Sequence, residues 1–299
     1  MFNWRAVTQL DIEALKILDA RCHEADGEEA VPQEAFSDFN MNHTEQICAA
    51  LAQDNGIDQV VAVGLTQLSG ETLMVRGKVH PEFRRRGLGT HILSWAEQQA
   101  SRYGLPRMLM IRNEAFNPDC EPLYRKAGYV RTQLSYFMRR NLDTDIPHIP
   151  SQFQHAAWND QNASQFFQVY QNAFRERPGF PNMREDEWIA GYKQDDDFRH
   201  DLSFLAFEGD QPIGFITAGV ANFHQTPMGW IIQVGSHPDW RGRGAAAGLI
   251  AKVMRMLKAE GLPYVELHVN DNNPGAKRVY EQLGFRVQGA RVKYQKVLS

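Results

Sequence analysis

Two short runs of arginine and glycine in this 299-residue chain combine the residue types that bind phosphate groups. Glycine and alanine leave backbone N–H groups open at the start of a helix, whose dipole adds about half a positive charge there. Arginine adds a full charge and a planar set of donors. Each run therefore predicts a cradle for a pyrophosphate group. The first comprises Arg84, Arg85, Arg86, Gly87, Leu88, Gly89 and Thr90, and the second comprises Arg241, Gly242, Arg243, Gly244, Ala245 and Ala246.

Other interpretations of these runs are weaker. A single run could be a solvated basic turn that merely starts a helix, but two runs at matching places argue against that. Neither run has the lysine and spacing of a P-loop. A dinucleotide fingerprint remains an alternative, since Gly242, Gly244 and Ala247 formally satisfy G-x-G-x-x-G/A. Against it, Arg85 replaces the first glycine in the other run, and the glycines follow a hairpin and a five-residue loop.

The elements around the runs follow from the apolar pattern. In the second half, helical spacing predicts helices over 163–174, 245–257 and 275–283. A hairpin over 202–207 and 213–220, strands over 230–234 and 264–269 and closing strands over 286–297 lie between and after them. The first half follows the same order, less clearly at its start. This mixture predicts an α+β fold with strands predominating in the middle of each domain.

The chain also repeats itself. His80-Pro81 and its arginines recur 157 residues later as His237-Pro238 and the second run, and beyond a loop the offset becomes 156, so that Tyr124 matches Tyr280. Such an ordered series indicates a tandem duplication. A segment with two prolines and two aspartates, 141–150, reads as the linker. The sequence thus predicts two domains, 1–147 and 148–299.

Four further residues are candidates because of their place in the repeat. A phenol has a pKa near 10, so Tyr124 and Tyr280 could act as proton donors, although a tyrosine there could simply pack against the sheet. Asn117 and Asn273 each precede a proline at a helix start. Their side chains could cap that helix or bind a cofactor, and the position favours capping.

Together these motifs resemble the GNAT superfamily of N-acetyltransferases, over about residues 60–140 and 205–299, in a tandem arrangement similar to that of mycothiol synthase. The resemblance implies two mixed, mostly antiparallel sheets flanked by helices. It also implies acetyl-CoA, with its pyrophosphate at the glycine turn and its pantetheine arm along a splayed fourth strand, 72–79 or 229–236. The backbone of Val79, or of Val234, Gly235 and Ser236, would bind that arm. An amine would attack the thioester directly, and Tyr124 or Tyr280 would protonate the thiolate.

The general base is where the chain departs from the family. Several relatives carry a glutamate near the start of the fourth strand, and the matching positions here hold Leu73 and Trp230. The candidates in the second half are His224, Glu266 and His268. The sequence therefore leaves the base open.

Composition limits the partners. The net charge of −4 gives no general reason to expect nucleic acid or an anionic membrane, and no segment has the roughly 18 apolar residues of a membrane span. Three cysteines without paired spacing predict a reducing compartment, hence the cytoplasm, and no metal site is expected. The hypothesis is a monomeric or homodimeric enzyme that acetylates a primary amine of a small molecule. The alternative is an acyl-CoA-binding sensor or scaffold in which one or both halves do not catalyse.

Overall fold

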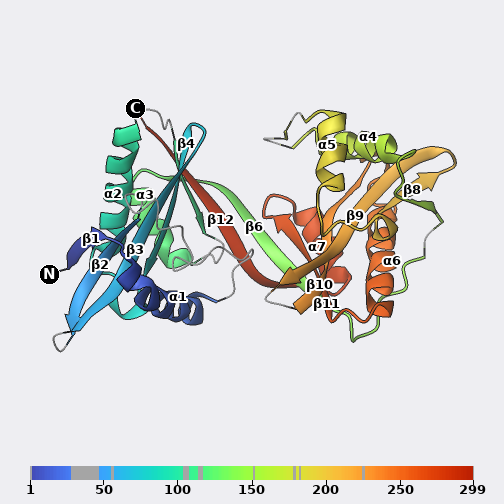
Figure 1. Cartoon of the computed structure of the whole chain (residues 1–299). Coiled ribbons are helices and arrows are strands. Elements are labelled where there is room, and N and C mark those ends of the chain that lie inside the picture. The colour runs from blue at the N-terminus through green and yellow to red at the C-terminus, as the bar shows by residue number, and fades with distance from the viewer. Residues whose placement is uncertain are drawn as a thin grey trace. The chain divides into compact units, whose positions relative to one another are not determined.

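The computed structural model describes residues 2–27, 47–54, 57–103, 108–113, 117–150, 152–177, 180–181, 183–223 and 226–298. The chain divides into two compact units. Unit 1 comprises Met1–Tyr136 and Gln288–Ser299, and unit 2 comprises Phe137–Val287. Each unit has a mixed sheet with helices on both faces (Figure 1), which confirms the predicted tandem α/β architecture.

Unit 1 is built on the sheet order β1-β2-β3-β4-β5-β12. Neighbouring strands are antiparallel except β4 and β5, which are parallel. Its elements are β1 (Asn3–Ala6), α1 (Ile12–Asp26), β2 (Ile47–Asp54), β3 (Ile57–Ser69), β4 (Thr72–Val79), α2 (Leu88–Tyr103), β5 (Met108–Asn113), α3 (Glu121–Lys126), the start of β6 (Val130–Asn141) and most of β12 (Arg286–Val297), with short 3-10 turns at Gln9–Asp11, Pro81–Phe83 and Pro118–Cys120.

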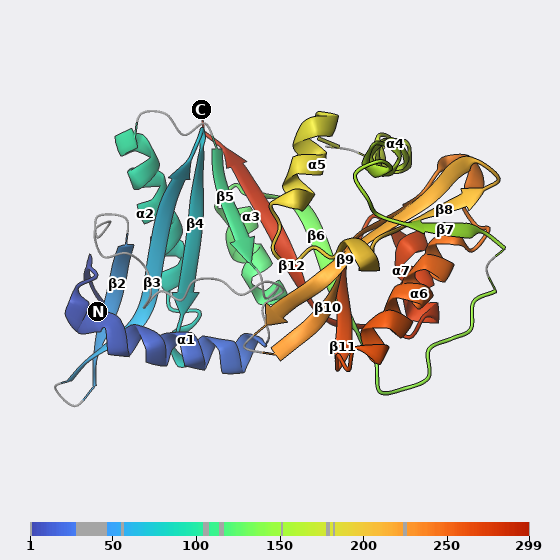
Figure 2. The ribbon, with the colours of Figure 1, turned by 45° about the vertical axis from the view of Figure 1, so that its right-hand side comes forward.

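Unit 2 repeats this plan with the order β7-β8-β9-β10-β11-β6, and β10 and β11 form its parallel pair. Its elements are β7 (Gln154–Ala157), α4 (Ala163–Phe174), α5 (Glu185–Lys193), β8 (Phe204–Glu208), β9 (Gln211–Phe223), β10 (Thr226–Ser236), α6 (Ala245–Ala259), β11 (Tyr264–Asn270), α7 (Pro274–Gln282) and the end of β6, with 3-10 turns at His200–Leu202 and Pro238–Trp240. Figures 1 and 2 show α4 and α5 on one face of this sheet and α6 and α7 on the other.

The predicted helices and strands of the second half all occur, and α4 has the predicted bounds. The sequence did not predict α5, which has only two buried residues, Trp188 and Tyr192, and therefore little apolar periodicity. β10 is longer than the predicted strand because its first residues are paired with β9 although two of them are exposed.

Alternation along the central strands sends side chains to both helical layers. In unit 1, Val63 and Leu65 of β3 pack in the cluster of α1, whereas a Cβ on Gly64 would lie 3.0 Å from Ile92 of α2. In unit 2, Phe215 of β9 packs in the aromatic cluster of α4, and Gly214 faces Ala245 of α6. Each fully buried large side chain contributes about 1.5–3 kcal/mol relative to exposure. The two-sided packing fixes the helix starts against the strand ends.

The last strand of each repeat completes the sheet of the other unit. β6 enters unit 2 at Phe137 and lies beside β11, where the N–H of Leu142 donates to the carbonyl of Pro263. β12 enters unit 1 at Gln288 and pairs antiparallel with β5, from Val292 opposite Asn113 to Val297 opposite Met108. Compact packing thus divides β6 and β12 between the units, whereas the predicted division at residue 147 follows chain order.

No helix within the described ranges combines the length and apolar character that crossing a membrane requires.

Candidate active site

The two arginine-glycine runs form the same backbone turn at the start of α2 and α6. In unit 1, His80 caps the 3-10 turn before the run, its Nδ1 accepting the N–H of Glu82 at 3.3 Å. In unit 2, His237 accepts the N–H of Asp239 in the same way at 3.4 Å. Both histidines therefore shape the turn.

Positive φ angles recur at matching positions of the turns. Gly87 and Gly244, directly before the helices, both have φ of 85°. Two residues earlier, Gly242 has φ of 77° and Arg85 has φ of 62°, a left-handed conformation that costs a non-glycine residue energy. The strained arginine shows that unit 1 keeps the turn even where the favourable glycine is missing. Beyond each turn, the first N–H groups of the helix have no partner inside the helix and can bind an anion.

The strands before these turns separate from their parallel neighbours. β4 pairs with β3 over its whole length but with β5 only from Thr72 to Val75. β10 pairs with β11 only from Gly229 to Ile231, and a bulge interrupts its register with β9 at that point. In both units the later part of the strand therefore has backbone groups that no parallel neighbour uses. An extended arm of a ligand can pair with such an edge.

A cavity of about 630 Å³ occupies this region of unit 1. Its size suits a small-molecule ligand. Of the predicted site residues, Val79, Arg84, Arg85, Gly87, Leu88, Gly89, Thr90, Asn117 and Tyr124 line it. Arg86 is not among them, and its guanidinium lies 4.9 Å from the ring centre of Phe83. Its counterpart Arg243 lies 4.4 Å from that of Trp240. These two arginines thus stack on the aromatic residue of the preceding 3-10 turn.

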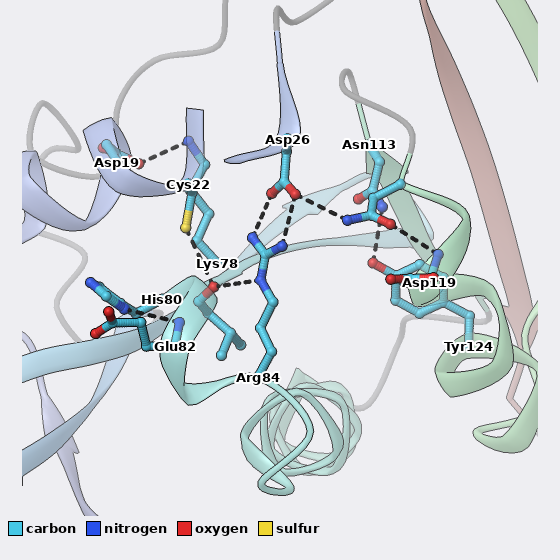
Figure 3. A network of polar contacts seen from close by, with 12 residues as sticks. Asp19, Cys22, Asp26, Lys78, His80, Glu82, Arg84, Asn113, Asp119 and Tyr124 are labelled. Carbon is cyan, nitrogen blue, oxygen red and sulfur yellow. Dashed lines mark hydrogen bonds and ion pairs between the residues drawn. The ribbon is translucent and has the colours of Figure 1, made fainter. Parts of the chain in front are cut away.

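Arg84, predicted to bind phosphate, is held by a carboxylate of its own unit. Its Nη1 and Nη2 donate to the two oxygens of Asp26 at 2.9 and 2.7 Å, and its Nε donates to the carbonyl of Val79 at 3.1 Å. Asn117 donates to the same carboxylate at 3.0 Å. In Figure 3, Asp26 lies between the arginine and the start of α3. The carboxylate joins the two sides of the cavity and neutralises the arginine.

Unit 2 has an arginine where unit 1 has Asp26. α1 and α4 begin 151 residues apart (163 − 12), and the same step relates Asp26 to Arg177. The N-cap residues of the two helices are related by the same step, because Asp11 accepts the N–H of Thr8 and Asn162 accepts the N–H of Asn159. The repeat thus extends over both first helices, where the sequence comparison did not find it.

The arginine of the second turn has a different partner from that of the first. Arg241 donates to the carbonyl of Ala173 at 3.1 Å, and no carboxylate contacts it within the described part of unit 2. Arg177 lies over the ring of Phe174, 4.1 Å from its centre. Loss of hydration, and to a smaller extent the charge of Arg241, lowers the pKa of Arg177. This side of unit 2 therefore carries two cations and no compensating acid.

The two candidate tyrosines differ in their surroundings. The hydroxyl of Tyr124 accepts the amide N–H of Asn113 at 3.0 Å and is hydrogen-bonded to the thiol of Cys120. Tyr280 is buried, and its hydroxyl has no hydrogen-bond partner among the residues whose positions are described. Burial raises the pKa of both phenols, to about 12 for Tyr280. Tyr280 is therefore protonated at neutral pH and available to a ligand.

Both candidate asparagines cap their helices. Asn117 accepts the N–H of Asp119 at 2.9 Å, and Asn273 accepts the N–H of Ala276 at 3.2 Å. This agrees with their place before a proline. Asn117 in addition binds Asp26, a contact that sequence spacing could not reveal because 91 residues separate the two.

The base candidates have structural surroundings that limit them. Glu266 is buried and accepts Nε of Arg139 at 2.6 Å, so its carboxylate is already engaged. His268 lies against Trp230, with ring centres 4.8 Å apart. Leu73 is fully buried in the core of unit 1. His224 lies outside the described residues.

The three cysteines are free thiols, and burial raises the pKa of each. Within the described ranges, no group of histidine, cysteine and acidic residues has the arrangement of a metal site.

Comparison with known proteins adds to this geometry. The model of the acetyltransferase (GNAT) family matches residues 12–129 and 163–285, one match for each unit. A mycothiol acetyltransferase from Gordonia bronchialis is 28% identical over 270 residues, covering 84% of each chain, and one from Acidothermus cellulolyticus is 27% identical over 235 residues, covering 73% of this chain and 69% of the relative.

Solved structures resemble the chain as well. A GCN5-related N-acetyltransferase from Sphaerobacter thermophilus is 25% identical, covers 99% of this chain and 95% of its own, and has a TM-score of 0.72. A tandem GNAT protein from the clavulanic acid biosynthesis pathway shares the fold, with 16% identity, a TM-score of 0.57 and coverage of 99% and 98%.

Proposed function

The chain belongs to the acetyltransferase (GNAT) family, and on that premise we propose that it transfers an acetyl group from acetyl-CoA to a primary amine of a small molecule. The names of its relatives, mycothiol acetyltransferases, support a small-molecule acceptor. Unit 2 carries the reaction. The observation that carries this assignment is Tyr280, a buried side chain of α7 that is protonated at neutral pH and whose hydroxyl has no hydrogen-bond partner within the described residues.

The residues of each cradle fit the carrier of the acetyl group. The open N–H groups of Ala245 and Ala246, directed along the axis of α6, suit the oxygens of a diphosphate. The backbone of Val234, Gly235 and Ser236, without a partner from β11, suits the amide groups of the pantetheine arm. In unit 1, the run Leu88–Thr90 supplies the corresponding groups at the cradle, whereas the carbonyl of Val79 already accepts hydrogen bonds from Arg84 and Cys22.

Direct transfer needs few groups from the protein. The amine nitrogen attacks the thioester carbonyl carbon, the carbon–sulfur bond breaks, and the amine loses a proton as the amide forms. Tyr280 donates its hydroxyl proton to the departing thiolate, which makes the free thiol. The proton that the amine loses passes to water, and the phenolate of Tyr280 takes a proton back from water, so that the net change is one proton moved from the amine to the thiol. Positioned proton transfer of this kind contributes about 10²- to 10⁴-fold to a rate. We assign no general base, because Glu266 is ion-paired and the strand position of the family glutamate holds Trp230.

The experiment that tests the proposal combines binding and turnover. Calorimetric titration with acetyl-CoA should reveal saturable binding, and a panel of small-molecule amines should include one that is acetylated above the hydrolysis background. No binding of acetyl-CoA would refute the proposal and lead to NAD as the next ligand to titrate. Binding without transfer to any amine would instead support an acyl-CoA sensor.

One observation favours a different role for unit 1. Arg84 is neutralised by Asp26 and the hydroxyl of Tyr124 is taken up by Asn113 and Cys120. The cavity can still accept a ligand of suitable size. We therefore propose that unit 1 binds an acyl-CoA without catalysing transfer. A titration stoichiometry of two sites, with turnover lost only in variants of unit 2, tests this division.

A further inference from the structure

We propose that Arg177 is a binding residue of unit 2, whose guanidinium holds the diphosphate of the acyl donor at the start of α6. The inference rests on the proposed function, because it names the part of acetyl-CoA that the residue contacts. No motif of the arginine-glycine run contains this residue. It lies in the turn that follows α4, 64 positions before Arg241 (241 − 177).

The first step is the position of Arg177 in the repeat. Its counterpart Asp26 contacts Arg84 at the glycine turn and Asn117 at the start of α3, so this position reaches both sides of the cavity in unit 1. In unit 2 the corresponding groups are Arg241 and Asn273, on either side of the region between α6 and α7. Arg177 lies three residues beyond the end of α4 at Phe174, close enough to the second cradle for the charge of Arg241 to act on it.

The second step is the packing that holds the residue there. The guanidinium of Arg177 rests on the ring of Phe174. That ring lies against β10, because a Cβ built on Gly235 would be 3.1 Å from its Cζ atom. Arg241 fixes the same helix end through the carbonyl of Ala173. Thus the end of α4, the strand that would hold the pantetheine arm and the glycine turn are in direct contact.

The third step is charge. Within the described residues, no acidic side chain pairs with Arg177 or Arg241. Burial, and to a smaller extent the charge of Arg241, lowers the pKa of Arg177. Two neighbouring cations on a protein surface repel each other, and an anion that binds between them offsets this repulsion. A diphosphate carries the required charge and accepts paired donors from guanidinium groups. Asp26 supplies that anion from the protein itself in unit 1.

The test compares two donors that differ in the diphosphate. Acetyl-CoA carries it, whereas S-acetylpantetheine has the same thioester and arm without it. Wild type, Arg177→Gln, Arg177→Lys and Arg175→Gln are assayed with both. Arg175 is the matched control, because it is an exposed arginine at the end of the same helix. We expect Arg177→Gln to raise the KM for acetyl-CoA about tenfold, the usual effect of losing a charged hydrogen bond.

The expected pattern is specific. With S-acetylpantetheine, Arg177→Gln should match wild type, Arg177→Lys should recover part of the acetyl-CoA affinity, and Arg175→Gln should change neither donor. An equal loss with both donors would overturn the inference and place Arg177 at the thiolate or the acceptor. No loss with either donor would also overturn it.

A second readout separates this inference from the proposed function. If no amine is acetylated, titration with CoA still measures binding. Arg177→Gln should weaken one class of sites about tenfold and leave any other class unchanged. Equal CoA affinity in wild type and Arg177→Gln would then refute the role of Arg177, whatever reaction the protein performs. Thermal melting of each variant verifies that it is folded.

Discussion

Units 1 and 2 have the same backbone at their cradles but differ in the side chains that face them. Both have a capping histidine, a glycine at φ of 85° and a parallel strand pair that stops early. Around this shared frame, unit 1 has Asp26 where unit 2 has Arg177. The hydroxyl of Tyr124 has two polar partners, whereas the hydroxyl of its counterpart Tyr280 has none among the described residues. After duplication, the turn that depends on backbone geometry stayed the same, whereas the charge and proton chemistry diverged.

The largest difference to test is in the two cores. Unit 2 contains the buried ion pair of Arg139 and Glu266. In unit 1, the position that is equivalent to Glu266 in the repeat is the fully buried Leu109. Arg139→Met should lower the free energy of unfolding by about 3–5 kcal/mol, because it removes the arginine that neutralises a buried carboxylate. Denaturant unfolding measures this. The double variant with Glu266→Gln should recover much of the loss, and equal stability of single and double variants would contradict the explanation.

The next test concerns the tyrosines. Tyr280→Phe should lower kcat about 100-fold, since the thiolate loses its proton donor, while binding of acetyl-CoA is kept. Tyr124→Phe should change kcat less than about twofold. Steady-state kinetics with the identified amine provide the measurement. The comparison fails if Tyr124→Phe has the larger effect, which would move catalysis to unit 1.

A smaller effect is expected at the ion pair of unit 1. Asp26→Asn removes the carboxylate that neutralises Arg84 and should increase the affinity of unit 1 for acetyl-CoA several-fold, as one charged contact becomes available to the ligand. It should also cost about 1 kcal/mol of stability, because the pair is half-buried. Two-site calorimetry resolves the change. Unchanged affinity at both sites would show that Asp26 does not compete with the ligand.

The smallest expected effect is that of alkaline pH on the acid. Burial raises the pKa of Tyr280 from 10 to about 12, so only about 1% of it is ionised at pH 10. We therefore expect a kcat profile without a descending limb up to pH 10. The fold favours the neutral phenol. The contribution of Tyr280 to the free energy of unfolding is therefore fully present below pH 10, and it is lost as the pH rises toward 12. A decline in kcat centred near pH 9 would exclude Tyr280 as the acid.

Local features of this molecule could be predicted from the sequence. The glycine turns, the helices that follow them and the capping roles of Asn117 and Asn273 depend on neighbouring residues, and the structure has them where spacing indicated. The ion pair of Arg84 with Asp26 joins residues 58 apart, and the partners are not related by any helical or strand period. The relation of Asp26 to Arg177 was hidden because the step between repeats is 151 at their first helices and 157 at the turns.

The exchange of last strands was equally hidden from sequence reading. The alternating pattern of β12, with Val292 and Tyr294 buried, is satisfied by the edge of β5 in unit 1. The same alternation would suit any sheet edge of the right face, because it encodes which side chains are buried and not which neighbour buries them. Only the three-dimensional pairing shows which sheet edge the strand joins.

That exchange bears on the history of the chain. A gene shortened to residues 1–147 would encode β5 without β12, and its complement would encode β11 without β6. The last strand of each product would then have to pair within its own unit, or leave a strand edge that is prone to aggregation. Once the strands had crossed, neither copy could be discarded without harming the other. A copy that gave up catalysis would still be inherited as the supplier of its partner's final strand, free to acquire a new ligand while its sheet was preserved.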